Sequence, residues 1–568
     1  MLTLRIARVA ALAATAAGVA AQPDFGPNVL IFDPSTPRPQ ERLDEIYARQ
    51  EKAEFGPDRY ALLFKPGKYD LDVKVGFYTH IAGLGPSPGE VAITGAVRAK
   101  ATWRKGSATC NFWRCVENLS VKPTLENNTN TWAVSQGVSL RRTHIKGDMN
   151  LWDGGWSSGG FLADSLIDGT LNSGSQQQWL SRNAAWGAWK GGNWNMVFVG
   201  TTNPPSGDWP EHPYTVVEKT PVIREKPYLF IDDSDRFAVM LPALRAQGTQ
   251  GISWGSASPQ SPGVPIPIDS FFLAHAENDN AASINAALAS GKHLILTPGI
   301  YHLGGTIRIT RPETVVLGLG YPTLVADTGV PAMAIADVDG VSVAGILFEA
   351  SEIPAPTLLQ VGEPGSAASH AANPTVLSDI FCRVGGAIVG RADCLVTIHS
   401  NDVVGDNFWL WRADHGTGAK WHINHNRNGL IVHGDNVTIY GLFVEHCHEY
   451  QTIWNGEGGR VYMYQSEMPY DPPDEAAWSH DGITGYASYK IADTVKTHEA
   501  WGVGIYCVFW DAAIIAHTAI EAPVVPGVNL HHKVTIRLNG KPGSGIRHII
   551  NSDGPSVLTP ANKRAQMP

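Results

Sequence analysis

The 568-residue sequence predicts an all-β protein built from two tandem right-handed parallel β-helices packed side by side. The length exceeds what one ordinary hydrophobic core serves, so two domains are expected. With 59 Gly and 38 Pro but only 17% charged residues, the composition is typical of many short strands joined by turns. An internal repeat of one series of elements is the third observation.

The repeat lies at the start of each predicted domain. A helical stretch at 41–52 precedes an apolar strand, the turn Pro66-Gly67 and Tyr69, and a Gly-x-Gly turn follows at 83–85. A second helical stretch at 281–290 precedes the same series, with Pro298-Gly299, Tyr301 and a Gly-x-Gly turn at 318–320. We therefore expect two copies of one module, with each helix capping the end of a strand stack.

Short apolar segments, such as 341–348, 395–398 and 437–444, follow each start and are separated by Gly, Asn or Asp. Strands this short cannot bury a face alone, but as coils of a solenoid they share one continuous core. A β-sandwich is the structural alternative, and the Gly-Leu-Gly turns and Asn-rich corners favour the solenoid over it.

The domain boundaries follow from composition. Residues 1–21 carry two arginines, an apolar run and small residues before Gln22, which is typical of a secretory signal peptide, so we expect a secreted, extracellular protein. The stretch 251–267 is rich in Gly, Ser and Pro and is interpreted as a linker or loop. We place the first β-helix domain, with this linker, at 22–267 and the second, which carries the catalytic carboxylates, at 268–568.

Charge, hydropathy and cysteine content indicate which partners and which cellular compartment to expect. The net charge of -10 is spread along the chain without a basic, aromatic groove, so we expect no nucleic acid. After the signal peptide no apolar run approaches the roughly 18 residues of a spanning helix, so we expect no membrane and a soluble monomer. Six Cys fit an oxidising compartment, and Cys110 with Cys115, or Cys382 with Cys394, are near enough in sequence to form disulfides, with the connectivity left open.

Candidate chemistry is densest at 444–473. Glu445 and Glu467 are 22 residues apart, about one coil, and adjacent coils are about 4.8 Å apart. Two carboxylates at that distance tend to share one proton, which is the state that a general acid requires. Ordinary solvated acids are the alternative, and the nearby aromatic residues, including Tyr450, Trp454 and Tyr470, favour a sugar-binding cleft.

These residues carry a family resemblance. The doubled module start, together with Glu445-His446 and, one coil later, the run from Gln465 to Tyr470, resembles glycoside hydrolase family 55. The resemblance implies pectate-lyase-like solenoids that cleave β-1,3-glucan from the non-reducing end with inversion. It implies Glu467 as the general acid, Glu445 as its carboxylate helper and Tyr470 as a subsite residue.

The remaining expectations for the site follow from this reading. Tyr450, Trp454 and Gln465 are further candidates for substrate binding. The expected partner is a β-glucan polysaccharide, and no cofactor or metal is expected. His446 and His448 share a strand face, but no third ligand accompanies them in the sequence.

The family also implies first-domain glutamines near the attacking water, and the run 176–178 is the segment that fits. On a strand Gln176 and Gln178 share a face, so both are our candidates, with an Asn/Gln ladder between coils as the alternative. Inverting pairs are usually about 6.5–9.5 Å apart, farther than neighbouring coils, so the identity of the base stays open. An acidic residue of the first domain and polar groups alone are the two possibilities.

The sequence leaves open other roles for three aspartates and other functions for the chain. Asp402, Asp406 and Asp414 are candidates for a subsite or for turn capping. A polysaccharide lyase would need a cluster of cations, and the segment 445–473 offers only Arg460. Hydrolysis of another linkage, and a non-catalytic glycan-binding β-helix, are the further alternatives.

Overall fold

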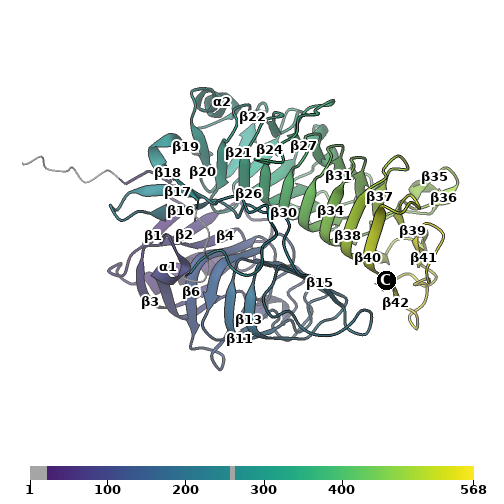
Figure 1. The fold of residues 1–568 in the computed structure, drawn as a ribbon, viewed down its shortest axis with the longest axis horizontal. Helices are drawn as coiled ribbons and strands as arrows, with labels where there is room; N and C mark the ends of the chain where they lie inside the picture. Colours follow the sequence, from purple (N-terminus) through teal and green to yellow (C-terminus); the bar gives the residue numbers. More distant parts are fainter. Residues whose placement is uncertain (1–21, 256–262) are drawn as a thin grey trace, which may run out of the picture.

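The computed structural model describes residues 22–255 and 263–568, which form an all-β protein of two large strand stacks (Figure 1). The predicted signal peptide, residues 1–21, lies outside the described residues, as does part of the predicted linker. No helix in the described part of the chain is both long and apolar enough to cross a membrane.

The first stack is a 15-stranded sheet in which each strand pairs in parallel with strands one or two elements further along the chain. Its main path contains β1 (Val29–Phe32), β2 (Tyr60–Phe64), β4 (Thr79–Gly83), β6 (Arg114–Pro123), β8 (Ser139–Ile145), β10 (Phe161–Ala163), β12 (Gln178–Arg182), β14 (Asn195–Val199) and β15 (Tyr214–Val217). Beside this path lie β3 (Gly67–Lys74), β5 (Val91–Arg98), β7 (Thr129–Thr131), β9 (Asp148–Asn150), β11 (Leu166–Asn172) and β13 (Ala185–Lys190). A chain that returns to the same edge in the same direction after each turn has the topology of a solenoid.

The second stack has two long sheets, in which strands again pair with strands further along the chain. One contains β19 (Phe271–Ala274), β20 (His293–Leu296), β23 (Val315–Gly318), β26 (Ser342–Ala350), β28 (Val376–Val384), β30 (Val404–Arg412), β32 (Thr438–Glu445), β34 (Gly459–Glu467), β38 (His498–Phe509), β40 (Val528–Gly540) and β42 (Arg564–Met567), with β21 (Ile300–Leu303) and β24 (Thr323–Ala326) beside them. The other contains β22 (Ile307–Ile309), β25 (Met333–Ile335), β27 (Ala355–Val361), β29 (Ala392–Ile398), β31 (Asn426–Val432), β33 (Thr452–Trp454), β37 (Tyr489–Ile491), β39 (Ile515–Glu521) and β41 (Gly545–Ile550). Apolar side chains of both sheets meet in one long core between them.

Smaller elements complete the described chain. A hairpin joins β35 (Ser479–His480) and β36 (Ile483–Thr484), and four short 3-10 helices are η1 (Pro88–Glu90), η2 (Thr102–Arg104), η3 (Ile268–Ser270) and η4 (Ala476–Trp478). The last strand, β42, pairs with β40 in the antiparallel sense.

Both predicted helices are present at the stack starts, as α1 (Pro39–Gln50) and α2 (Ala281–Ala289). The repeated tyrosines also behave alike. The Tyr69 hydroxyl donates to the carbonyl oxygens of Phe32 and Lys65, and the Tyr301 hydroxyl donates to those of Ala274 and Thr297. In both copies one acceptor ends the first strand of the stack and the other directly follows the second strand, which explains why each Pro-Gly turn is followed by Tyr.

The segment between the stacks departs from the expected linker. It contains an antiparallel sheet of β16 (Tyr228–Ile231), β17 (Phe237–Leu241) and β18 (Val264–Pro267). Its buried side chains pack with Leu63 of the first stack and Leu317 of the second. The connection therefore shares a hydrophobic core with both stacks.

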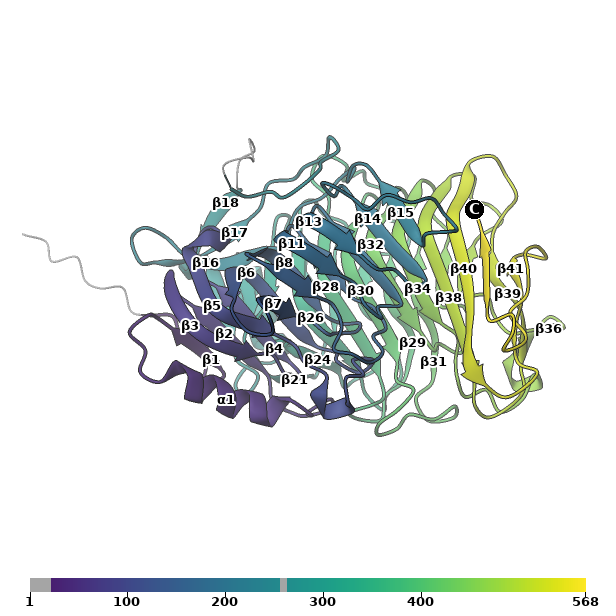
Figure 2. The same ribbon diagram turned by 90° about the horizontal axis from the view of Figure 1, so that it is seen from below.

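The two stacks lie side by side (Figure 2), and side chains of β8, β10 and β12 in one meet those of β28, β30 and β32 in the other. Aromatic residues fill this interface, and the indole rings of Trp113 and Trp409 approach to 4.6 Å between centroids. Buried ion pairs cross it, from Arg141 to Asp379 at 2.7 Å and to Asp406 at 2.6 Å. The interface is thus a second core, and it fixes the relative position of the residues on its two sides.

The expected disulfides are absent from the described structure, where all six cysteines are buried free thiols. Cys115 begins the β6 region beside His80, whereas Cys110 lies in the preceding loop near His415. Cys382 and Cys394 belong to β28 and β29, on different sheets of the second stack. Proximity in sequence did not bring either pair into a bond.

Candidate active site

Glu445 and Glu467 occupy equivalent positions on neighbouring strands, as the 22-residue spacing predicts. They end β32 and β34, which pair in parallel with Glu445 directly opposite Glu467. Alternation along each strand sends Val444 into the core of the second stack and the glutamates to the opposite face. Phe443, two residues before Glu445, belongs to the aromatic interface, so the pair faces the first stack.

Glu445 is held from both sides by hydrogen-bond donors. Its Oε1 accepts from Nε2 of Gln136 at 2.8 Å, and its Oε2 accepts from Nε1 of Trp409 at 2.8 Å. Only 3% of the residue is exposed. Burial raises the pKa of Glu445 to about 7, although the bonds from Trp409 and Gln136 act in the opposite direction.

Glu467 is more weakly held than Glu445 and a stronger candidate for carrying a proton. Its Oε1 accepts a long bond of 3.4 Å from Gln465 Nε2. Burial, followed by the charges of Glu445 and Asp414, raises the pKa of Glu467 well above its ordinary value. The raised pKa favours the protonated form of this carboxyl group, which is the state that a general acid requires.

Asp414 is the third carboxylate of the site. It follows β30, and its Oδ1 contacts Nδ1 of His415 at 2.9 Å. Although desolvation opposes it, this hydrogen bond lowers the pKa of Asp414 to about 2. The charge of Asp414 thus persists at neutral pH and favours the protonated forms of both glutamates.

Of the three aspartates singled out in the sequence, only Asp414 lies beside the glutamates. Asp406 is fully buried between Arg141 and Arg182. Asp402 accepts hydrogen bonds from the backbone and side chain of a neighbouring loop, at His370 N and Ser369 Oγ. These two residues are structural.

The glutamine prediction for the first stack needs a correction. The Gln176 amide donates to the carbonyl oxygens of Val134 and Leu151 and accepts from Gly159 N. All three partners belong to the first stack, so Gln176 is a ladder residue between coils. Its side chain does not reach the carboxylates.

Gln178 lies on the interface, on the same side as Gln136. A methyl group placed on Gly159 would be 2.9 Å from Gln178 Nε2 and 3.3 Å from a ring carbon of Phe443, so the glutamine and Phe443 flank one glycine. Gln136, the residue that contacts Glu445, was missed by the prediction. It lies two coils before Gln178, and the two coils differ in length, with 20 residues from Gln178 to Ser158 and 22 from Ser158 to Gln136.

Four buried polar atoms on this side of the interface have no partner in the described residues: Gln465 Oε1, Tyr506 OH, Gln178 Oε1 and Asn195 Oδ1. Tyr506 pairs with Glu467 in register, and Gln465 pairs with Gly504. A methyl group on Gly504 would be 2.6 Å from the Tyr506 hydroxyl and 3.3 Å from the Asn195 amide nitrogen. Buried polar groups are rarely left unpaired, so this set is suited to water and to sugar hydroxyls.

The aromatic residues predicted to bind substrate lie in different parts of the structure. Tyr470 is half-buried and packs on His446, with 4.2 Å between ring centroids, close to the ends of β32 and β34. Tyr450 contacts His480 of the β35–β36 hairpin and Glu521 of β39, on the other sheet of the second stack. Its contacts place it away from the glutamates.

Trp454 is a core residue rather than a sugar platform. It is fully buried, and it pairs in register with Val432 and Ile491, two other residues of the same core. This register explains its burial, because the same strand position faces inward on successive coils. Gln465, in contrast, lies in the carboxylate site as predicted and contacts Glu467.

Comparison with known proteins finds close relatives of this chain. The family described as the LAM55 pectate lyase-like domain matches residues 271–467, a range that ends on Glu467. A curated protein named "Exo-beta-1,3-glucanase", from Streptomyces sp. (strain SirexAA-E / ActE), is 48% identical over 535 residues, which cover 94% of this chain and 87% of that protein.

Solved structures give the same relationship. The structure of sacteLam55A from Streptomyces sp. SirexAA-E matches with a TM-score of 0.93 and 46% identity, over 96% of this chain and 98% of that one. A glutamate-to-alanine variant of sacteLam55A in complex with glucose matches with the same TM-score, at 45% identity and the same coverage.

Proposed function

This chain belongs to glycoside hydrolase family 55, and we propose that it is an inverting exo-β-1,3-glucanase in which Glu467 is the general acid. The observation that carries the proposal is the buried pair of Glu445 and Glu467, in register on neighbouring strands and without a cation partner in the described chain. Membership of a hydrolase family removes the non-catalytic glycan-binding alternative. The relative named as an exo-β-1,3-glucanase supports the substrate.

Glu467 supplies the proton for bond cleavage. Its carboxyl O–H donates to the glycosidic oxygen as the bond from that oxygen to the anomeric carbon breaks, so the sugar leaves as a neutral alcohol. Glu445 keeps the proton on Glu467 before the reaction, because two carboxylates in contact resist a second negative charge. Gln136 and Trp409 hold Glu445 in this position.

The attacking water is held by the unpartnered polar atoms of the interface. Gln178 Oε1 is a buried acceptor beside Phe443, and Tyr506 and Gln465 flank Glu467. Glu445 is too close to Glu467 to leave the gap of about 6.5–9.5 Å that an inverting acid and base share. We therefore assign Gln178 to orienting the water. As the water oxygen bonds to the anomeric carbon, it releases one proton to solvent, and a proton from solvent then restores Glu467, whose protonated form Glu445 favours.

The wider architecture belongs to the same proposal. Two right-handed parallel β-helices, with the boundary near residue 268, fit the order of parallel pairing in both stacks. We propose that the protein is a secreted, extracellular monomer; the proposed secretion is supported by the signal-peptide pattern of residues 1–21. Its partner is a glucose polysaccharide, in keeping with the glucose complex of a relative.

Product analysis tests the function. The purified chain is incubated with β-1,3-, β-1,6- and β-1,4-glucans, and released sugars are followed by chromatography and by proton NMR of the anomeric signals. We expect small products from the β-1,3-glucan alone, appearing first as the α-anomer. Initial release of the β-anomer would contradict inversion, and preferential cleavage of another glucan would contradict the substrate.

A further inference from the structure

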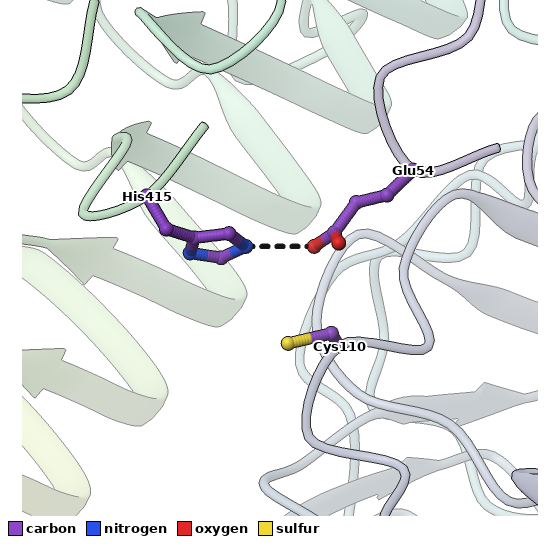
Figure 3. Close-up of side chains that lie close together, drawn as sticks. All are labelled: Glu54, Cys110 and His415. Carbon is purple, nitrogen blue, oxygen red and sulfur yellow. Dashed lines mark hydrogen bonds and ion pairs between the residues drawn. The ribbon is translucent and has the colours of Figure 1, made fainter. Parts of the chain in front are cut away.

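We propose that Glu54, Cys110 and His415 form a binding site for one Zn²⁺ ion between the two stacks, separate from the carboxylate pair. Figure 3 shows the Glu54 carboxylate facing the His415 ring, with the Cys110 sulfur beside both. The three residues come from different loops: Glu54 follows α1, Cys110 precedes β6 and His415 follows β30. Because 361 positions separate Glu54 from His415, sequence spacing gave no sign of this cluster, and no metal was expected.

The ligand atoms are already close enough for one ion. The nitrogen, sulfur and oxygen atoms lie within 4.8 Å of one another, and His415 Nε2 is 2.8 Å from Glu54 Oε1. Tetrahedral zinc bonds of about 2.0–2.3 Å place ligand atoms roughly 3.3–3.8 Å apart. Small side-chain movements therefore suffice. A set of thiolate, imidazole and carboxylate favours zinc over magnesium or calcium, which prefer oxygen alone.

The contacts that hold the His415 ring in place are those expected for a metal-binding histidine. Its Nδ1 contacts Asp414 Oδ1 at 2.9 Å, which directs Nε2 toward Glu54 and Cys110. Phe55 and Trp411 pack on the imidazole, with ring centroids 5.6 and 5.4 Å away. A carboxylate behind a metal-binding histidine fixes the ring and raises its basicity, and such partners accompany most metal-binding histidines.

A second cluster in the described chain serves as an internal comparison. His80, Cys115 and Glu117 also bring three possible ligand atoms within 4.8 Å of one another. There, however, Lys226 Nζ lies 2.7 Å from Glu117, so a built-in cation already neutralises the carboxylate. All three side chains of that cluster are buried, whereas 36% of the His415 side chain is exposed and gives an ion a path to the first cluster.

The position suggests the consequence of binding. An ion held by Glu54 and Cys110 from the first stack and by His415 from the second would join the two stacks directly. Asp414 connects this cluster to the carboxylate pair, because its charge acts on both glutamates. The proposed zinc ligands and the carboxylate pair have no residue in common, so zinc binding and hydrolysis can be tested separately.

Metal binding to the full chain, stripped of metal with a chelator, is the test. Zn²⁺ is titrated against a chromophoric competitor, and Co²⁺ is added in parallel because a cobalt–thiolate bond gives a charge-transfer band in the near ultraviolet. We expect one ion per chain and a thiolate band. Cys110→Ser should abolish the band and weaken zinc binding at least tenfold, and Asp414→Asn should weaken it about 10- to 100-fold.

Cys115→Ser is the matched control, because it removes a buried cysteine that also lies beside His and Glu, and it should leave the stoichiometry and the band unchanged. Absence of zinc binding by the wild-type chain, cobalt bound without a thiolate band, or loss of binding on Cys115→Ser but not on Cys110→Ser would overturn the proposal. A disulfide at Cys110, detected by intact mass after thiol labelling, would overturn it as well. If Cys110→Ser fails to fold, the cobalt spectrum of the wild-type chain decides.

Discussion

Two clusters of buried carboxylates lie on the same interface between the stacks, and they differ in their counterions. In the first cluster, Asp379 and Asp406 contact Arg141 at 2.7 and 2.6 Å. Although burial opposes it, Arg141 and then Lys226 hold the pKa of Asp379 below its ordinary value. In the second cluster, Glu445 and Glu467 face each other, and burial raises the pKa of both.

The comparison shows how one interface serves two purposes. A buried acid beside an arginine stays ionised and joins the stacks, whereas a buried acid beside another acid keeps its proton and can give it away. The carboxylates of both clusters are buried, so burial does not distinguish the clusters. The presence or absence of a cation separates the structural acids from those that we propose to be catalytic.

The largest expected effect is the loss of catalysis on Glu467→Gln. The amide keeps the size of the side chain but has no acidic proton, so we expect kcat on β-1,3-glucan to fall about 10²- to 10⁴-fold while substrate still binds. Steady-state kinetics and binding by calorimetry measure the two quantities. Glu363→Gln, an exposed glutamate of the same stack, is the control and should retain wild-type turnover. Near-normal turnover of Glu467→Gln would end its assignment as the acid.

Removing a cation from the first cluster should act on stability instead. Arg141→Met leaves Asp379 and Asp406 short of their shared partner, and breaking a buried pair in this way costs about 3–5 kcal/mol. Denaturant unfolding measures the change. Glu467→Gln, examined in the same way at pH 7, should be as stable as the wild type or more stable. A large loss of stability in both variants would erase the distinction between the clusters.

Glu445→Gln should move a pH limb rather than abolish activity. Without the negative neighbour, Glu467 loses its proton more readily, so its pKa falls and the basic limb of the pH–rate profile moves to lower pH by about one unit or more. The profile of kcat/KM on β-1,3-glucan measures this shift. A basic limb that stays in place would mean that the two carboxylates are not coupled.

The smallest effect is in the pH dependence of stability. The folded-state pKa of Glu467 is raised, so the folded protein binds a proton that the unfolded chain releases above its ordinary pKa near 4.5. The stability that this proton contributes is therefore present at low pH and is lost as pH rises above about 5 toward the raised pKa of the folded state. Unfolding free energies of wild type and Glu467→Gln should diverge over this window, in favour of the variant, by at most about 1.4 kcal/mol per pH unit. Parallel curves would contradict the raised pKa.

The sequence predicted the elements whose cause is local. Both helices, both Pro-Gly turns and the register of Glu445 with Glu467 follow from turn chemistry and from a coil length of 22 residues, and the structure contains them. The placement of Gln465 beside Glu467 follows from the same strand alternation.

The wrong predictions for the glutamines depend on which side chains of the first stack face the second stack. Coils of the first stack differ in length, so that Gln178 pairs with Asn195 after only 17 residues, and a single strand pattern did not show which glutamine reaches the carboxylates. Gln136 was missed for this reason and Gln176 chosen wrongly. The sequence predicts substrate binding by Trp454, and this prediction is wrong because the strand register places Trp454 beside Val432 and Ile491 in the core, which its neighbours in sequence do not reveal.

The protonation state of Glu467 at neutral pH tests the central claim most directly. An infrared difference spectrum between wild type and Glu467→Gln at pH 7 isolates the carboxyl group of this residue. The account predicts a C=O stretching band of a protonated carboxylic acid in the wild type, and a weaker band in Glu445→Gln at the same pH. A carboxylate band from Glu467 in the wild-type protein would contradict the account.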